Sequence, residues 1–127
     1  MLAGLELGGV PLATALSLEL GIRAAFVRKV AKPYGTAKLA EGAPVEGRRV
    51  VVVEDVVTSA GQVVASVGDL RAFGAVVDLA LCVIDREEGG SDRLAALGVE
   101  LRSLLRHRDL EAARSTSTRG RPSAAQA

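Results

Sequence analysis

The stretch VVVEDVVTSAGQ, residues 51–62, decides the fold. A run of valines meets two adjacent carboxylates, Glu54 and Asp55, and two more valines then lead into a turn of small residues. Unbroken valines predict a strand that is buried on both faces, as in a parallel sheet. Ligands of open α/β sheets bind beyond the carboxyl ends of the strands. The paired acids are therefore expected at a ligand site.

The small residues after this strand predict an anion-binding turn. They lead into a helix N-terminus, where backbone N–H groups and the helix dipole favour negative charge, and Thr58 and Ser59 add hydroxyl donors. The turn has neither the Walker pattern nor G-x-G-x-x-G. A ligand with a phosphate bound in the turn and a vicinal diol bound by the acids would be a ribose phosphate. The alternative is an ordinary strand–turn–helix with solvated acids.

The rest of the chain alternates between helical and strand patterns. Helices are predicted over residues 8–21, 60–74, 91–98 and 106–114, and strands over 22–27, 48–55, 76–85 and 99–105. This order implies right-handed crossovers and a doubly wound, mostly parallel α/β sheet with helices on both faces. The irregular segment 28–47 is expected to be a functional loop.

The two ends of the chain carry separate expectations. We expect a core domain over residues 1–113 and a disordered tail over 114–127, which is polar and aperiodic. Only MLAG stands where the first strand of the sheet should be, so the chain looks cut at its front. We therefore expect that strand to be lost and a sheet edge to be exposed.

Composition excludes several classes of protein. The chain has 127 residues, the size of one domain, and a net charge of +1 with a pI near 7.9, which does not favour a nucleic-acid binder. Its single cysteine, Cys82, cannot form an internal disulfide and is expected to be a buried apolar residue. No apolar run approaches a membrane span, and no signal peptide is evident. A soluble cytoplasmic protein is expected.

Four segments together resemble the type I phosphoribosyltransferases. VVVEDVVTSAGQ is similar to the family's motif for phosphoribosyl pyrophosphate (PRPP), and ELGGVPLA, residues 6–13, to its pyrophosphate loop. FVRKVAKPYGTAKLAEG, residues 26–42, resembles the flexible catalytic loop, and VIDREEGG, residues 83–90, the stretch that contacts orotate. The PRPP motif alone indicates the superfamily, whereas RKVAKPYG combined with DREEGG resembles the orotate phosphoribosyltransferases. The expected fold is therefore type I phosphoribosyltransferase-like.

The resemblance implies a reaction and its partners. Ribose 5-phosphate would pass from PRPP to orotate, giving orotidine 5′-monophosphate and pyrophosphate, a step of pyrimidine biosynthesis. Mg²⁺ is the implied cofactor, held through PRPP near Asp55, with no direct protein ligand assigned. A homodimer is implied, in which the catalytic loop reaches the neighbouring subunit's site. Neither nucleic acid nor membrane is an expected partner.

The resemblance also assigns roles to individual residues. Glu54 and Asp55 would hold the ribose hydroxyls, and Arg86 would pair with the orotate carboxylate, with Thr58 also near the base. Lys29, Lys32 and Asp55 are the implied catalytic residues. The implied 5-phosphate site is Thr58, Ser59, Ala60, Gly61 and Gln62, the pyrophosphate loop is Glu6, Leu7, Gly8 and Gly9, and the loop contacts to PRPP are Arg28, Lys29, Lys32 and Tyr34.

Several features depart from the family pattern. Tyr34 stands where many members have a histidine, and tyrosine stays neutral near pH 7. Ala60 replaces a common glycine, which is tolerable only if its φ is negative. The lone histidine, His107, lies outside every motif, and nothing matches the family's N-terminal hood over the base.

Alternatives to the orotate assignment stay open at this point. The chain could be a non-catalytic PRPP-binding regulator, or a phosphoribosyltransferase for a purine or uracil, although Arg86 argues for an acidic pyrimidine. The loop cations Arg28, Lys29 and Lys32 could be no more than a solvated charged loop. Asp85 and Arg86 could form a surface ion pair.

Overall fold

The strands form one mostly parallel sheet, as the sequence predicts. The computed structural model of the chain describes residues 1–29 and 40–119. Within these residues the elements are β1 (Leu2–Leu5), α1 (Gly9–Leu20), β2 (Ala24–Val27), β3 (Ala40–Gly42), β4 (Arg49–Val57), α2 (Gly61–Ala72), β5 (Val76–Asp85), α3 (Gly90–Ala95), β6 (Glu100–Arg106) and α4 (His107–Arg119). The strand order is β3-β2-β1-β4-β5-β6, and only the β2–β3 pair is antiparallel.

Strand β1 corrects one expectation from the sequence. The first strand is present, and it lies in the middle of the sheet, where Ala3 pairs with Ala25 of β2 and with Val52 of β4. All four of its residues are buried. The expectation of a lost strand and an exposed edge there was wrong, because four residues are too few to show a periodic pattern. Pairing with two neighbours is what defines this strand.

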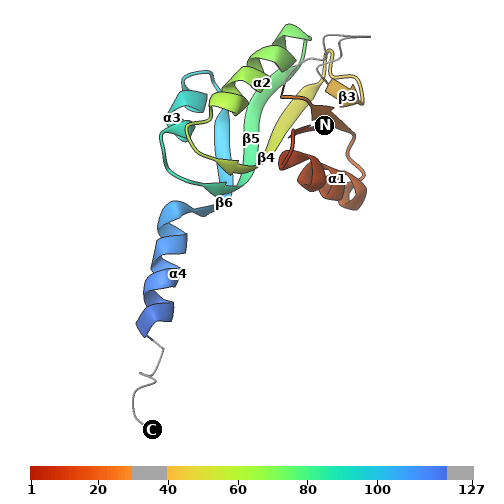
Figure 1. Cartoon of the computed structure of the whole chain (residues 1–127). Helices are drawn as coiled ribbons and strands as arrows, with labels where there is room; N and C mark the ends of the chain where they lie inside the picture. Colours follow the sequence, from red (N-terminus) through yellow and green to blue (C-terminus); the bar gives the residue numbers. More distant parts are fainter. Residues whose placement is uncertain (30–39, 120–127) are drawn as a thin grey trace.

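Helices cover both faces of the sheet, as predicted. Figure 1 shows α1 on one side of the sheet and α2 and α3 on the other. The larger core lies on the α2 side and includes Val52, Val67 and Leu70, and a smaller core lies under α1 around Ala13 and Val53. An open apolar groove remains between α1 and the β5–β6 part of the sheet, lined mainly by Leu12, Leu16, Leu81, Val83 and Leu104.

The C-terminal helix is longer than predicted. Helix α4 projects from the body of the molecule (Figure 1) and continues to Arg119. The hydroxyls of Ser115 and Thr116 donate to the carbonyls of Glu111 and Ala112, both at 3.0 Å, which satisfies polar groups that would otherwise favour a turn. The expected disordered tail over 114–127 is thus helical in its described part, and residues 120–127 lie outside the described residues.

Strand β3 falls inside the segment that the sequence predicts to be irregular. Its three residues have no pattern of their own, and pairing with β2 defines the strand.

Within residues 1–29 and 40–119, no helix combines the length and apolar composition that crossing a membrane requires.

Candidate functional site

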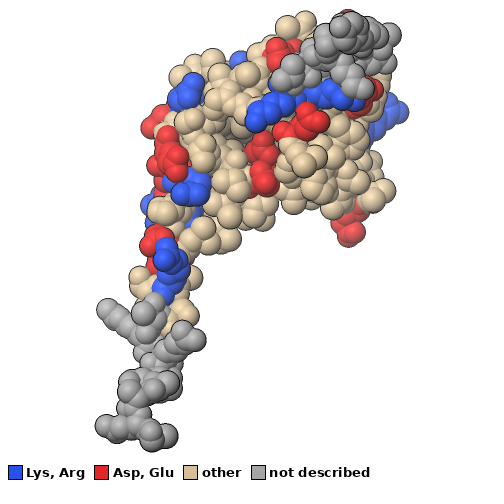
Figure 2. All heavy atoms as spheres, in the orientation of Figure 1, with Lys and Arg blue, Asp and Glu red and all other residues tan. Residues whose placement is uncertain are grey.

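The predicted site residues meet at one edge of the sheet. Strands β1, β4 and β5 are parallel neighbours, so their carboxyl ends point the same way. The predicted pyrophosphate loop, residues 6–9, follows β1. The acid pair and the predicted phosphate turn, residues 58–62, lie at the end of β4, and the DREEGG stretch follows β5. Figure 2 shows acidic side chains next to a band of Lys and Arg side chains on one face, beside α1.

The glycines of the pyrophosphate loop pack directly on β4. A Cβ atom on Gly8 would lie 2.2 Å from Cγ of Asp55, and one on Gly9 would lie 2.1 Å from the carbonyl oxygen of Val53. Neither position has room for a side chain. The loop and the acid pair are therefore in contact, and the glycines are required for that contact.

The two acids have different surroundings. Glu54 is only 8% exposed, whereas Asp55 is exposed. The backbone N–H of Asp55 donates to Oε1 of Glu54 at 3.0 Å, and that of Val56 donates to Oδ1 of Asp55 at 2.7 Å. Burial, followed by the neighbouring Asp55 carboxylate, raises the pKa of Glu54 from 4.5 to about 7, against the opposing backbone N–H groups of Asp55 and Gly9. Glu54 can therefore carry a proton near neutral pH.

The phosphate turn opens onto an uncapped helix. Thr58 and Ser59 are exposed, and α2 begins at Gly61 with no side-chain cap. The first N–H groups of any helix have no partner within the helix. Apart from its chain neighbours and the backbone of α2, no described atom lies within 4 Å of the place where a Cβ on Gly61 would stand, so this side of the helix start is open. The turn can thus hold an anion.

Ala60 corrects a second expectation. Its φ is 60°, in the left-handed region, whereas the expectation from the sequence was a negative φ for alanine here. Tertiary packing overrides the preference: Ala60 is 4% exposed, and Arg93 Nη1 donates to the carbonyl of Ser59 at 2.9 Å. Gly90 lies so close that a Cβ there would stand 2.5 Å from the carbonyl oxygen of Thr58. The turn is therefore held in a fixed shape from the α3 side.

Arg86 lies next to the phosphate turn. Its backbone N–H donates to the carbonyl of Val57 at 2.9 Å, which joins the DREEGG stretch to the end of β4. Its half-exposed guanidinium pairs with Glu88 at 3.6 Å. Asp85 instead accepts the N–H of Glu87 at 2.8 Å. The structure therefore does not pair Asp85 with Arg86, the alternative that the sequence left open.

The start of the predicted catalytic loop is tied to the pyrophosphate loop. The backbone N–H of Lys29 donates to Oε2 of Glu6 at 3.0 Å. Arg28 Nη2 pairs with Glu41 of β3 at 3.6 Å, and its buried Nε has no hydrogen-bond partner among the described residues. Sequence reasoning missed the Glu6–Lys29 contact, since no local pattern links residues 23 positions apart. Lys32 and Tyr34 lie outside the described residues.

Comparison with known proteins assigns the family. The family model of the phosphoribosyl transferase domain matches residues 1–99. The chain belongs to the phosphoribosyltransferase family. It is 53% identical over 114 residues to an orotate phosphoribosyltransferase of Nocardioides sp., an alignment that covers 90% of this chain and 64% of the relative.

Two solved structures of phosphoribosyltransferases are similar to this one. The orotate phosphoribosyltransferase of Aeropyrum pernix superposes with a TM-score of 0.78 at 33% identity, covering 90% of this chain and 63% of the other. The Mycobacterium tuberculosis orotate phosphoribosyltransferase in complex with PRPP gives a TM-score of 0.76 at 37% identity, covering 86% and 63%. The chain thus spans under two thirds of the length of these three proteins.

Proposed function

We propose that this chain carries the substrate-binding core of an orotate phosphoribosyltransferase, which transfers ribose 5-phosphate from PRPP to orotate in pyrimidine biosynthesis. The observation that carries the proposal is the contact of three segments at one sheet edge. The glycine loop packs on Asp55, the acids lead directly into the phosphate turn, and the Arg86 stretch is hydrogen-bonded to Val57. Similarity to proteins named orotate phosphoribosyltransferase supports the choice of reaction.

Each segment would bind one part of PRPP. Glu54 and Asp55 would accept hydrogen bonds from the ribose hydroxyls. The open N-terminus of α2 would bind the 5-phosphate through backbone N–H groups, together with Thr58 and Ser59. In the Glu6–Gly9 loop, the backbone N–H groups of Leu7 and Gly8 would face the diphosphate, because the Glu6 N–H already donates to Val27 and the Gly9 N–H is directed at Glu54.

Catalysis would rest on charge rather than covalent chemistry. Negative charge builds on the leaving diphosphate as the bond to the ribose breaks, so fixed cations that face it stabilise the transition state. Lys29, at the root of the loop, and Lys32 would supply this charge, and Tyr34 would donate a hydrogen bond. The Glu6 carboxylate accepts the Lys29 N–H, so it would fix the direction in which the chain leaves β2.

The residues at this edge fit Mg²⁺ as the cofactor. The described residues include no group of three or more His, Cys, Asp or Glu side chains that could hold a metal alone. Mg²⁺ prefers oxygen ligands and keeps several from substrate or water, which suits the exposed carboxylate of Asp55 together with PRPP oxygens. When bound, the ion would neutralise charge on the diphosphate.

The choice of orotate over another base rests on Arg86. A planar guanidinium suits a carboxylate, which orotate has and adenine and uracil lack. The half-exposed Arg86 is held 3.6 Å from Glu88, so a substrate carboxylate would compete for it. We further propose a cytoplasmic homodimer in which the loop serves the partner's site.

Product formation tests this function. The full chain would be mixed with PRPP, Mg²⁺ and orotate, and orotidine monophosphate measured by chromatography. We expect product with orotate and none with adenine or uracil. Arg86→Ala should abolish use of orotate and retain PRPP binding in calorimetry. Product from another base would overturn the base assignment, and PRPP binding without any product would favour a PRPP-binding regulator.

A further inference from the structure

The turn that carries Arg86 is held from two sides. On one side the Arg86 N–H donates to Val57, which joins the turn to the end of β4 beside the phosphate site. Arg93 of the following helix α3 also donates to Ser59 of that site. On the other side lies the junction of β6 and α4. Parallel pairing of Asp85 with Arg106 brings the carboxyl ends of β5 and β6 together there. Arg86 therefore stands between the phosphate turn and the start of α4.

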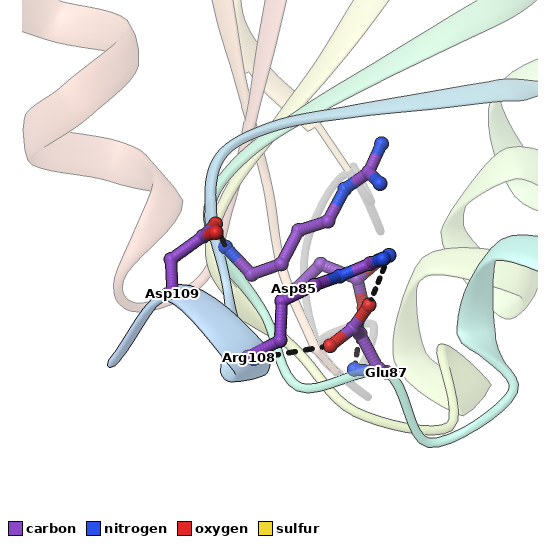
Figure 3. A network of polar contacts seen from close by, with 5 residues as sticks. Asp85, Glu87, Arg108 and Asp109 are labelled. Carbon is purple, nitrogen blue, oxygen red and sulfur yellow. Dashed lines mark hydrogen bonds and ion pairs between the residues drawn. The ribbon is translucent and has the colours of Figure 1, made fainter. Parts of the chain in front are cut away.

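Glu87 makes the contact to α4. Its φ of 56° is left-handed, so the chain reverses immediately after Arg86. The N–H of Glu87 donates to Oδ1 of the buried Asp85 at 2.8 Å, which fixes the reversal. Figure 3 shows the Glu87 side chain directed at Arg108, which it contacts twice: Oε2 accepts the Arg108 N–H at 3.1 Å, and Oε1 pairs with the guanidinium.

The first turn of α4, which carries Arg108, is also held at the end of β6. Asp109 Oδ2 accepts the N–H of Arg106 at 2.7 Å, which closes the first turn of α4 at the end of β6 (Figure 3). Arg108 lies beyond residue 99, where the family match ends. The contact therefore joins a segment outside the matched domain to the turn that carries the proposed base-recognition residue.

We propose that Glu87 and Arg108 form a positioning pair, which orients the Arg86 turn and so tunes recognition of the base. The inference rests on the proposed role of Arg86. Arg108 touches no substrate in this account, and it acts through Glu87 on the neighbouring residue. Loss of the pair should weaken base recognition and leave PRPP binding unchanged, because the phosphate turn keeps its own contact to Arg93 of α3.

The test compares two arginines on the same strand–helix unit. Arg108 and Arg102 have side chains that are 64% and 63% exposed, and each pairs with a glutamate, but Arg102 pairs with Glu100, away from the Arg86 turn. Arg108→Ala, Arg108→Lys and Arg102→Ala would be prepared in the full chain. Calorimetry would give the dissociation constants of orotidine monophosphate and of PRPP with Mg²⁺, and thermal unfolding would report the fold.

A half-exposed ion pair has a modest effect, so we expect Arg108→Ala to raise the dissociation constant of orotidine monophosphate about fivefold. That of PRPP should change by less than about twofold, Arg108→Lys should recover part of the loss, and Arg102→Ala should change neither. If Arg108→Ala binds orotidine monophosphate as wild type does, the inference is wrong and the proposed function still stands. The same holds if the affinities for both ligands fall equally. A wild-type chain that binds PRPP but not orotidine monophosphate would overturn the base assignment and this inference with it.

Discussion

Glu54 gives the sharpest test of the site's electrostatics. Its raised pKa means that the folded chain holds this proton more tightly than the unfolded chain does. The stabilisation that this proton contributes to the folded chain is fully present below the ordinary pKa of 4.5, and it is lost as the pH rises to about 7. At pH 8 the folded chain must keep a buried carboxylate beside Asp55. Glu54→Gln removes that cost, so its effect on stability should depend on pH.

The shift of the Glu54 pKa sets the magnitude. From 4.5 to about 7, at about 1.4 kcal/mol for each pKa unit, the full cost of the charge is about 3.5 kcal/mol. Part of this cost is already present at pH 5. The stability of Glu54→Gln relative to wild type should therefore rise by about 2 to 3 kcal/mol between pH 5 and pH 8. Comparison across pH cancels any constant effect of the amide on packing.

Urea unfolding of both proteins at pH 5 and pH 8 provides the assay. Glu100→Gln is the matched control, because the hydrogen bond from Arg102 lowers the pKa of Glu100 and leaves it charged at both pH values. Its effect should not change between them. A stability difference for Glu54→Gln that is the same at both pH values, or larger at pH 5, would show that folding does not raise the pKa of Glu54.

Three further predictions concern the turns that build the site. Gly9→Ala should destabilise the chain by about 1 to 3 kcal/mol in urea unfolding, since its Cβ would meet the Val53 carbonyl at 2.1 Å. The control, Gly61→Ala, should cost under about 1 kcal/mol. Equal effects of the two variants would show that Gly9 is not packed against β4. The free energy of unfolding of Ala60→Gly should stay within about 1 kcal/mol of wild type, because relief of the left-handed strain offsets the lost burial. Ala60→Val should cost clearly more. A well-tolerated valine would count against the left-handed turn. Glu6→Ala should speed amide exchange at Lys29 in NMR, and Glu6→Gln, which keeps an acceptor oxygen, should not; protection that survives in the alanine variant would rule out the contact.

Local patterns predicted the framework of the site. The valines before Glu54 gave a buried strand, and the small residues after Val57 gave the start of α2, because both follow from neighbours in the chain. Strands β1 and β3 could not be recognised this way. They have four and three residues, and pairing with other strands defines them.

Contacts between residues far apart in the chain could not be predicted from the sequence. The Glu6–Lys29 and Glu87–Arg108 contacts join positions 23 and 21 apart, and neither spacing has a signal of its own. The left-handed Ala60 depends on packing by α3, which a local preference cannot foresee. The roles of Lys32 and Tyr34 stay predictions, because both residues lie outside the described part of the chain.

Calorimetric titration of PRPP with Mg²⁺ into wild type and Asp55→Asn tests whether the acid pair at the end of β4 binds PRPP. Asp55 is exposed, so the variant should fold, and it loses the carboxylate that packs on Gly8. We predict saturable binding of one PRPP per chain, and a loss of about tenfold or more in the variant, as expected for hydrogen bonds to a charged group. Absence of saturable binding in the wild type, or equal affinity in the two proteins, would show that this sheet edge is not a PRPP site built on Asp55.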